Sequence, residues 1–327
     1  MKKRKFLQAF LIASCISLSL VGCTSNEQPT PVQNETAQDS AEDTSVEEST
    51  PEVATYPVSI VDSTGTTITL NEEPQKIVSL APSTTEILGA LGVTDKVVGR
   101  TKYCNYPEAI TEAQDVGGTS NPNVETIVAL QPDLVVASTH VSDEVISKLR
   151  EVNIPVAFLN EQENFEGTYS AIENIGLLVG RTKEAEQVVA GMKAQIEETM
   201  NKVNALNKEV KTRVYYAVWY GDSDSTAGGD TFIGEMITLA GGDNVAKDVE
   251  GWSISKEKIV EGDPDMIIVP AGNGLKEAFE TTEFYKDLRA VQEGHIYEIN
   301  QDMISRQGPR LAEAFSKLAQ IINPELQ

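Results

Sequence analysis

A phrase of twelve residues occurs twice in this chain of 327 residues. At positions 125–136 it reads ETIVALQPDLVV, and at positions 257–268 it reads EKIVEGDPDMII. The glutamate, the Ile-Val pair and the Pro-Asp pair recur at the same spacing, and an apolar run follows each time. A residue of the helix-capping type stands two places before each glutamate, Asn123 and Ser255. Each copy therefore predicts a capped short helix, a stop at Pro-Asp and a buried strand.

A second pair of matching phrases precedes the two copies in the same order. Residues 86–88 read EIL and are followed by Gly92, and residues 235–237 read EMI and are followed by Gly241. Two ordered pairs indicate an internal duplication, which usually marks a repeated supersecondary unit. Strand-like and helix-like segments alternate around both copies, which is typical of a mostly parallel α/β sheet. We therefore expect two similar α/β lobes, at residues 56–181 and 209–327.

A long helical pattern separates the two lobes. The segment that follows Thr182, its expected cap, contains no proline and one glycine as far as residue 207. Apolar residues recur in it at intervals of three and four, at Val189, Met192, Ile196, Met200 and Val203. Such a helix would be roughly 37 Å long, enough to join two lobes. We predict a bridging helix at residues 182–208, with an ordinary surface helix of one lobe as the alternative.

The remaining elements follow from shorter patterns. An alternating pattern at 58–61 and 66–70, with Ser-Thr-Gly between, predicts a small hairpin. Expected strands lie at 76–80, 96–99, 134–138, 154–159, 213–219, 266–270 and 295–299, with a loop at 220–229. One expected helix ends near residue 91, two more span 143–151 and 231–239, and a last one ends near residue 321.

The first 22 residues have the pattern of a signal peptide. Four positive residues at 2–5 precede an apolar stretch from Phe6 to Val21, and residues 20–23 read LVGC, which resembles the bacterial lipobox. The resemblance implies cleavage before Cys23 and diacylation of its thiol. A transmembrane anchor is the alternative, but about 16 apolar residues are few for a span. We expect a lipid anchor in the cell membrane, with the protein on its extracytoplasmic side.

The segment from Cys23 to residue 55 is polar and acidic. It contains no lysine or arginine, and it carries eight acidic residues, Glu27, Glu35, Asp39, Glu42, Asp43, Glu47, Glu48 and Glu52. Such a segment buries too little apolar surface to offset its ordering entropy, so we expect a disordered linker. The formal charge of −24 argues against a nucleic-acid partner. Cys104 is the one cysteine of the expected folded body, which excludes an internal disulfide there.

Signatures of enzymes and resident metals are scarce. The chain has no Gly-x-Ser-x-Gly, Walker, His-Glu-x-x-His or Gly-x-Gly-x-x-Gly motif. Its two histidines, His140 and His295, exclude a three-histidine metal site. His140 follows a strand and is either a loop residue or an axial ligand. We expect no enzyme activity, no metal site and no permanently bound cofactor; a surface-anchored enzyme or an adhesion lipoprotein remains the alternative of another class.

Aromatic side chains with a polar group gather in loops after strands, at Tyr103, Tyr106, Trp219, Tyr220 and Trp252. They would line a cleft for a large flat ligand, with charge from Arg100 and Arg306; ordinary packing is the alternative. Glu125 and Glu257 open matched helices, where the helix dipole alone favours an acid. Two matched acids on two lobes also suit a two-fold symmetric partner.

Several phrases taken together resemble the iron-chelate and cobalamin class of ABC-transporter solute-binding proteins. They are IVSLAPSTTE at 77–86, Tyr103 with Tyr106-Pro107, NVETIVALQPDLV at 123–135 and RQGPRL at 306–311, and the likeness covers about residues 75–323. The resemblance implies two Rossmann-like lobes joined by a rigid helix, with a transported small-molecule chelate in the cleft between them. It also implies an ABC permease dimer and its ATPase subunits as partners.

The resemblance assigns roles to single residues. Glu125 and Glu257 would dock onto arginines of the two permease subunits, and Tyr103 would stack on the ligand. The expected ligand-binding set is Tyr103, Thr119, Trp219, Trp252 and Arg306. Thr119 and Ser138 stand where cobalamin-binding members have tryptophans, so the ligand is either a corrinoid or a ferric chelate, including haem and ferric siderophores. The aromatic residues favour a macrocycle, whereas Arg100, Arg306 and Arg310 favour an anionic chelate.

Overall fold

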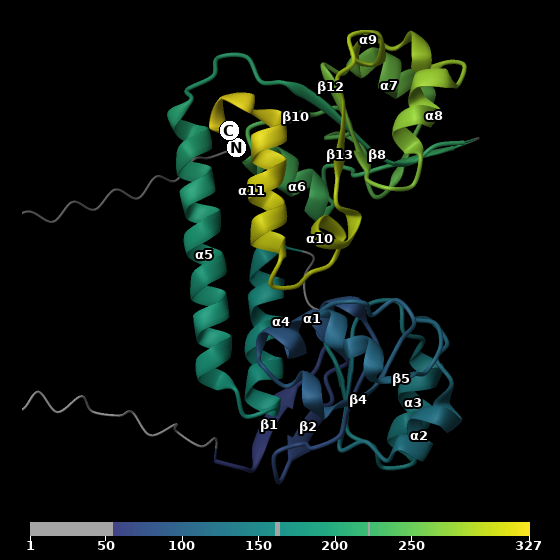
Figure 1. The fold of residues 1–327 in the computed structure, drawn as a ribbon, viewed down its shortest axis with the longest axis vertical. Helices are drawn as coiled ribbons and strands as arrows, with labels where there is room; N and C mark the ends of the chain where they lie inside the picture. The colour runs from purple at the N-terminus through teal and green to yellow at the C-terminus, as the bar shows by residue number, and fades with distance from the viewer. Residues whose placement is uncertain (1–54, 161–163, 222) are drawn as a thin grey trace, which may run out of the picture. The chain divides into compact units, whose positions relative to one another are not determined.

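The computed structural model describes residues 55–160, 164–221 and 223–327 (Figure 1). The predicted signal peptide, the predicted lipidation site Cys23 and nearly all of the predicted acidic linker lie outside the described residues. The folded body opens with the expected hairpin, in which β1 (Val58–Val61) pairs antiparallel with β2 (Thr67–Leu70). Among the described residues, no helix is long and apolar enough to cross a bilayer.

The first lobe is built on a five-stranded parallel sheet. Its strand order is β5-β4-β3-β6-β7, and every neighbouring pair is parallel. The strands are β3 (Ile77–Ser79), β4 (Val97–Arg100), β5 (Gln114–Asp115), β6 (Leu134–Ala137) and β7 (Val156–Phe158). The helices that alternate with them are α1 (Pro82–Ala90), α2 (Val124–Leu130) and α3 (Asp143–Glu151). This confirms the predicted parallel α/β sheet.

The second lobe has a parallel centre with an antiparallel extension. Strands β10 (Asp243–Asn244), β8 (Arg213–Trp219), β12 (Met266–Pro270) and β13 (Ile296–Ile299) pair in parallel. On the other part of β8, β9 (Asp224–Thr226) pairs antiparallel and is followed outward by β11 (Ser253–Ile254). The helices of this lobe are α6 (Phe232–Leu239), α7 (Lys256–Gly262), α8 (Leu275–Thr281), α9 (Arg289–Gln292), α10 (Gln301–Ser305) and α11 (Leu311–Ile322).

The prediction of a loop throughout residues 220–229 is wrong, because strand β9 forms in the middle of this segment. The sequence there is polar, which argued for a loop. The buried hydroxyl of Thr226 donates to the carbonyl of Tyr216 at 2.8 Å, so a side chain of β9 satisfies an acceptor on β8. A polar segment can therefore add to the sheet without leaving that buried acceptor unpaired.

Both copies of the repeated phrase form the predicted capped helix. The side chain of Asn123 accepts a hydrogen bond from the backbone N–H of Thr126 at 2.9 Å, at the start of α2. The hydroxyl of Ser255 accepts from the N–H of Lys258 at 3.3 Å, at the start of α7. Each side chain satisfies a first-turn donor that has no partner within the helix.

The repeated aspartate ties each copy to its sheet. Asp133 accepts from the backbone N–H of Lys76 at 2.9 Å, just before β3. Asp265 accepts from the backbone N–H of Arg213 at 2.8 Å, at the start of β8. Each aspartate also donates its own backbone N–H to the carbonyl of the same residue. The Pro-Asp pair thus fixes the strand that follows it against its neighbour, which confirms the duplication in three dimensions.

The bridging helix is present as α5 (Thr182–Ala205), next to α4 (Phe165–Leu178) and α11 (Figure 1). Thr182 is its first residue and not its cap: the capping position belongs to Arg181, which makes no side-chain capping hydrogen bond. Helix α4 was not predicted. The ring of Phe165, at its start, packs edge-on against Phe232 of α6 at 5.3 Å and Phe315 of α11 at 5.6 Å. The two lobes therefore share apolar core around these helices, while their exact boundaries stay a prediction.

Candidate functional site

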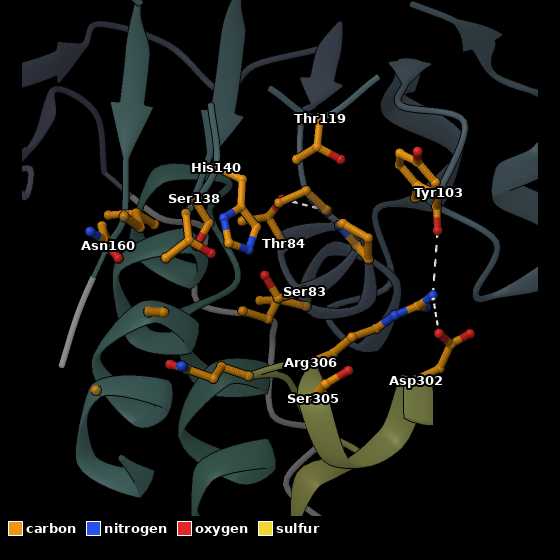
Figure 2. Close-up of a pocket in the computed structure, with 18 of the residues that line it drawn as sticks. Ser83, Thr84, Tyr103, Thr119, Ser138, His140, Asn160, Asp302, Ser305 and Arg306 are labelled. Carbon is orange, nitrogen blue, oxygen red and sulfur yellow. Dashed lines mark hydrogen bonds and ion pairs between the residues drawn. The ribbon is translucent and has the colours of Figure 1, made fainter. Parts of the chain in front are cut away.

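A cavity of about 470 Å³ lies at the carboxyl ends of the first lobe's strands (Figure 2). Its wall comes from the loops after the five strands of this lobe, from α1 and α4, and from α10 with the residues that follow it. Parallel sheets usually bind ligands at this edge, because the loops there converge on one crevice. The volume is within the usual range of about 300–1,000 Å³ for small-molecule sites.

The lining is rich in neutral hydrogen-bonding groups. Hydroxyl and amide side chains on it include Ser83, Thr84, Thr119, Ser138, Thr139, Asn160, Gln301, Ser305 and Gln307. The first turn of α1 also lines the cavity, and the backbone N–H groups of a first helical turn have no acceptor within the helix. The site is therefore suited to a ligand that carries many uncharged donors and acceptors.

Arg306 is the one lysine or arginine among the described residues that line this cavity. Its guanidinium donates to the carboxylate of Glu86 at 3.0 Å and to the side chain of Asn105 at 2.8 Å. It also pairs with Asp302 at 2.8 Å and contacts the backbone carbonyl of Tyr103 at 3.4 Å (Figure 2). Because its terminal nitrogens already bind two carboxylates, Arg306 offers a ligand little uncompensated positive charge.

Glu86 connects Arg306 to a second arginine. Its side chain is only 1% exposed, and Arg310 donates to it twice, at 2.9 and 2.6 Å. This fork geometry is the strong form of an arginine–carboxylate pair, and it raises the pKa of Arg310. The guanidinium of Arg310 also lies 4.0 Å from the ring centre of Tyr106. This ion pair argues against the prediction that Arg310 supplies charge to a ligand, because the carboxylate of Glu86 already neutralises its guanidinium.

The five residues predicted to bind ligand fall into two groups. Tyr103, Thr119 and Arg306 line the cavity together, and the side chain of Tyr103 is exposed. Trp219 and Trp252 are exposed but do not line it. Trp219 ends β8 and stacks on Tyr220, with ring centres 6.0 Å apart. The ligand contacts of all five residues stay predictions.

Arg100 does not line the cavity. Its side chain is largely buried, lies 3.8 Å from Asp115, and donates to the carbonyls of Thr101 and Thr111. His140 does line it, and its backbone has a positive φ of 77°. Such a φ is uncommon for a residue with a side chain, and strained residues cluster at functional sites.

The family resemblance singled out Thr119 and Ser138, and sequence reasoning missed most of the other neutral lining. Ser83 and Thr84 lie within the IVSLAPSTTE phrase, and Asn160 follows strand β7. The signal that was available is their place directly after a predicted strand. Ser305 gave no such signal, because it is far along the chain from the first lobe and lies next to that lobe's strand ends only in the folded structure.

Glu125 and Glu257 occupy equivalent places in the two lobes. Each lies in the first turn of its helix, α2 or α7, and each is exposed. Hydrogen bonds from its own backbone N–H and from Ser255 lower the pKa of Glu257, so this side chain is charged at neutral pH. The geometry leaves both carboxylates accessible to a partner; their docking role stays a prediction.

Comparison with known proteins decides the family. A model of the periplasmic binding proteins matches residues 77–303, which include both copies of the repeat and all of the cavity lining except Ser305, Arg306 and Gln307. The chain belongs to the periplasmic binding protein family. This confirms the resemblance that the repeated phrase and its neighbours suggested.

Two relatives and one solved structure show how far this family likeness extends. An uncharacterized ABC transporter substrate-binding lipoprotein of Bacillus subtilis, YvrC, is 34% identical over 99% of both chains. A cobalamin-binding protein of Halobacterium salinarum is 31% identical over 81% of this chain and 73% of that one. The crystal structure of a possible iron-binding (periplasmic solute-binding) protein of Staphylococcus epidermidis superposes with a TM-score of 0.68. It has 28% identity, and the match covers 77% of this chain and all of that one.

Proposed function

We propose that this periplasmic binding protein is the lipid-anchored receptor of an ABC importer and that its ligand is a corrinoid. The relatives support the first part, since one is named as an ABC transporter substrate-binding lipoprotein and another as a cobalamin-binding protein. A preformed cavity at the strand ends supports a binding role. The protein captures the ligand outside the membrane and delivers it to the permease.

The choice between a corrinoid and an anionic chelate rests on the ion pairs of Arg306. A corrinoid presents neutral carboxamides around its ring, whereas haem presents carboxylates and many ferric siderophore complexes are anionic. A cation that is not already neutralised would stabilise a buried anionic ligand more than hydroxyl and amide groups do. Arg306 is paired with Glu86 and Asp302, and the rest of the polar lining is hydroxyl and amide. The cavity therefore favours an amide-rich, uncharged ligand over an anionic chelate.

Calorimetric titration of the full chain with cyanocobalamin, hemin and a ferric siderophore tests this choice. We expect cyanocobalamin to bind with a dissociation constant of about 1 μM or less, and the two anionic ligands to bind at least tenfold more weakly. The absence of cyanocobalamin binding at micromolar concentration would remove the corrinoid from consideration.

Haem or a ferric siderophore is the second candidate. Tyr103 and His140 both line the cavity with exposed side chains, and either residue type can bind iron. Tighter binding of hemin than of cyanocobalamin would favour this candidate. Titration of His140→Ala beside the wild type then tells whether the histidine contributes.

Glu125 and Glu257 are the proposed docking residues for the two permease subunits. Their support is equivalence within the repeat, exposure, and placement on matched helices. Transport by purified permease in vesicles should fall strongly with the double variant Glu125→Ala/Glu257→Ala, while ligand affinity stays near wild type. Glu261→Ala, an exposed acid elsewhere on α7, serves as the control and should transport normally. Unchanged transport by the double variant contradicts the docking role.

The anchor is proposed from the lipobox-like residues 20–23. Diacylation of Cys23 would add two acyl chains, which suffice for stable attachment to a bilayer. Substitution Cys23→Ser should release the protein from the membrane fraction, and mass spectrometry should detect the lipid on the wild type alone. An unmodified wild-type Cys23 contradicts this assignment.

A binding role without enzyme activity completes the proposal. The family is one of binding proteins, and the sequence lacks the catalytic motifs described above. Turnover of any hydrolase substrate at the cavity, lost on filling it with cyanocobalamin, would revive the enzyme alternative.

A further inference from the structure

Glu86 is a buried carboxylate that the proposed ligand need not touch. It lies in α1 with 1% of its side chain exposed, and it is absent from the cavity lining. Three donor groups from two arginines converge on it, Nη1 of Arg306 and both Nε and Nη2 of Arg310. The two arginines come from a segment more than 200 residues later in the chain.

The same two arginines hold the loop that carries Tyr103. Arg306 donates to the side chain of Asn105 at 2.8 Å and contacts the carbonyl of Tyr103 at 3.4 Å. Arg310 lies over the ring of Tyr106 at 4.0 Å. The loop at 103–106, which lines the cavity through Tyr103, is thus fastened to the segment between α10 and α11 through guanidinium groups. Glu86 is the carboxylate that both of these groups share.

This polar connection differs from the other connection between the lobes. Around Phe165 the lobes meet through apolar side chains of α4, α6 and α11, which interact through non-directional contacts. The cluster of Glu86, Arg306 and Arg310 depends on charge and on fork geometry instead. Removing the charge of Glu86 leaves Arg310 without its carboxylate partner and Arg306 with Asp302 alone, which weakens this connection.

We propose that Glu86 and Arg310 are positioning residues of the ligand site. They hold Arg306 and the loop at 103–106 in one arrangement, so ligand affinity depends on an ion pair outside the ligand's contacts. This rests on the proposed function for the identity of the ligand, but the order of the loop is measurable without any ligand. Glu235 provides a matched control, because it occupies the same place in the repeat on α6 and is exposed.

Hydrogen–deuterium exchange of the full chain, without ligand, tests the positioning role. With Glu86→Gln we expect faster exchange in residues 101–107 and 302–308, and no change with Glu235→Gln. Arg310→Lys keeps the charge but loses the fork, so its effect should be intermediate. Adding Arg310→Gln to Glu86→Gln should produce little further change, since the two residues act as one unit.

Calorimetry with cyanocobalamin provides the second measurement. We expect about tenfold weaker binding for Glu86→Gln and a smaller loss for Arg310→Lys, with Glu235→Gln at the wild-type value. Wild-type exchange and affinity in both Glu86→Gln and Arg310→Lys overturn the proposal. A fall in melting temperature with exchange at 101–107 and affinity unchanged also overturns it, because the cluster would then be only structural. If the wild type does not bind cyanocobalamin, the corrinoid assignment fails and the exchange experiment alone decides.

Discussion

Glu86 and Glu235 open the same repeated phrase, one in each lobe, and their surroundings differ. Glu86 is buried and bound by two arginines from the end of the chain, whereas Glu235 is exposed on α6. The two helices end alike, since each is followed by a glycine with positive φ, Gly92 or Gly241. The copies therefore share this local feature, whereas Glu86 makes ion pairs with a segment far along the chain and Glu235 is exposed.

The repeated aspartates show a milder version of the same contrast. Asp133 binds backbone N–H groups of Gln75 and Lys76. Asp265 binds the equivalent backbone N–H and adds the guanidinium groups of Arg213 and Arg289. The backbone contact common to both copies is what the fold requires, and the arginines are an addition in the second lobe. Residues that differ between the copies are thus the place to look for functions beyond folding.

The largest difference between the copies should appear on neutralising Glu86 and Glu235. Glu86→Gln removes the carboxylate partner of Arg310 and one of the two carboxylate partners of Arg306, and we expect a loss of about 3 kcal/mol in unfolding free energy. Glu235→Gln should change it by less than about 0.5 kcal/mol, because the side chain is exposed. Urea unfolding of the two variants measures both values. Equal effects of the two substitutions would contradict the contrast.

Substitutions of the two repeated aspartates should differ less in their effect on the free energy of unfolding. Asp265→Asn removes charge-assisted hydrogen bonds to two arginines, and we expect a loss of about 2 kcal/mol. Asp133→Asn keeps an acceptor for its backbone partners, so about 1 kcal/mol or less is expected. The same urea titrations compare the variants. A larger loss for Asp133→Asn would mean that the backbone contact outweighs the arginines.

Acid pH should reduce the difference in stability loss between Asp265→Asn and Asp133→Asn. Hydrogen bonds from Arg213 hold the pKa of Asp265 well below its ordinary value of 3.8. A carboxylate with a lowered pKa stabilises the fold above its unfolded pKa, and this contribution is lost as the pH falls. The penalty of Asp265→Asn should therefore be constant from pH 7 to 5 and shrink below about pH 4. A penalty that grows toward acid pH would contradict this sign.

The smallest difference between the two copies should come from the helix caps. Asn123→Ala and Ser255→Ala each remove one capping hydrogen bond, which typically costs about 1 kcal/mol. The bond of Asn123 is 2.9 Å long and that of Ser255 is 3.3 Å, so Asn123→Ala should be the more destabilising. Thermal unfolding of the two variants compares them directly. Equal melting temperatures would show that the lobes do not differ at this position.

Most of the fold was predictable because the repeat is built from local signals. Helix α3 and strands β8 and β12 have the predicted limits, since alternation or helical periodicity and their flanking residues are strong there. Helix α4 was missed because glycine, threonine and aromatic residues in it are weak helix formers. Its glycine at 176 is needed by packing: a Cβ there would lie 2.4 Å from that of Ala185 on α5. Tertiary contact, not local preference, makes that helix.

The candidate site was predictable only in part, for a similar reason. Tyr103 follows a strand, so its position along the chain suggested it, whereas the family resemblance alone suggested Thr119. The pairing of Glu86 with Arg306 and Arg310 joins residues 220 and 224 apart, and no sequence spacing encodes it. The sequence predicted that both arginines bind an anionic ligand, because nothing in it indicates that Glu86 is their partner.

A crystal structure of the full chain with cyanocobalamin tests the central claim most directly. The account predicts the corrinoid in the cavity, in contact with Tyr103 and Thr119, with Arg306 still bound to Glu86 and Asp302. Its amides should bind the hydroxyl-rich lining instead of the guanidinium. A corrinoid bound elsewhere, or a ligand that takes Arg306 away from Glu86, would contradict the account.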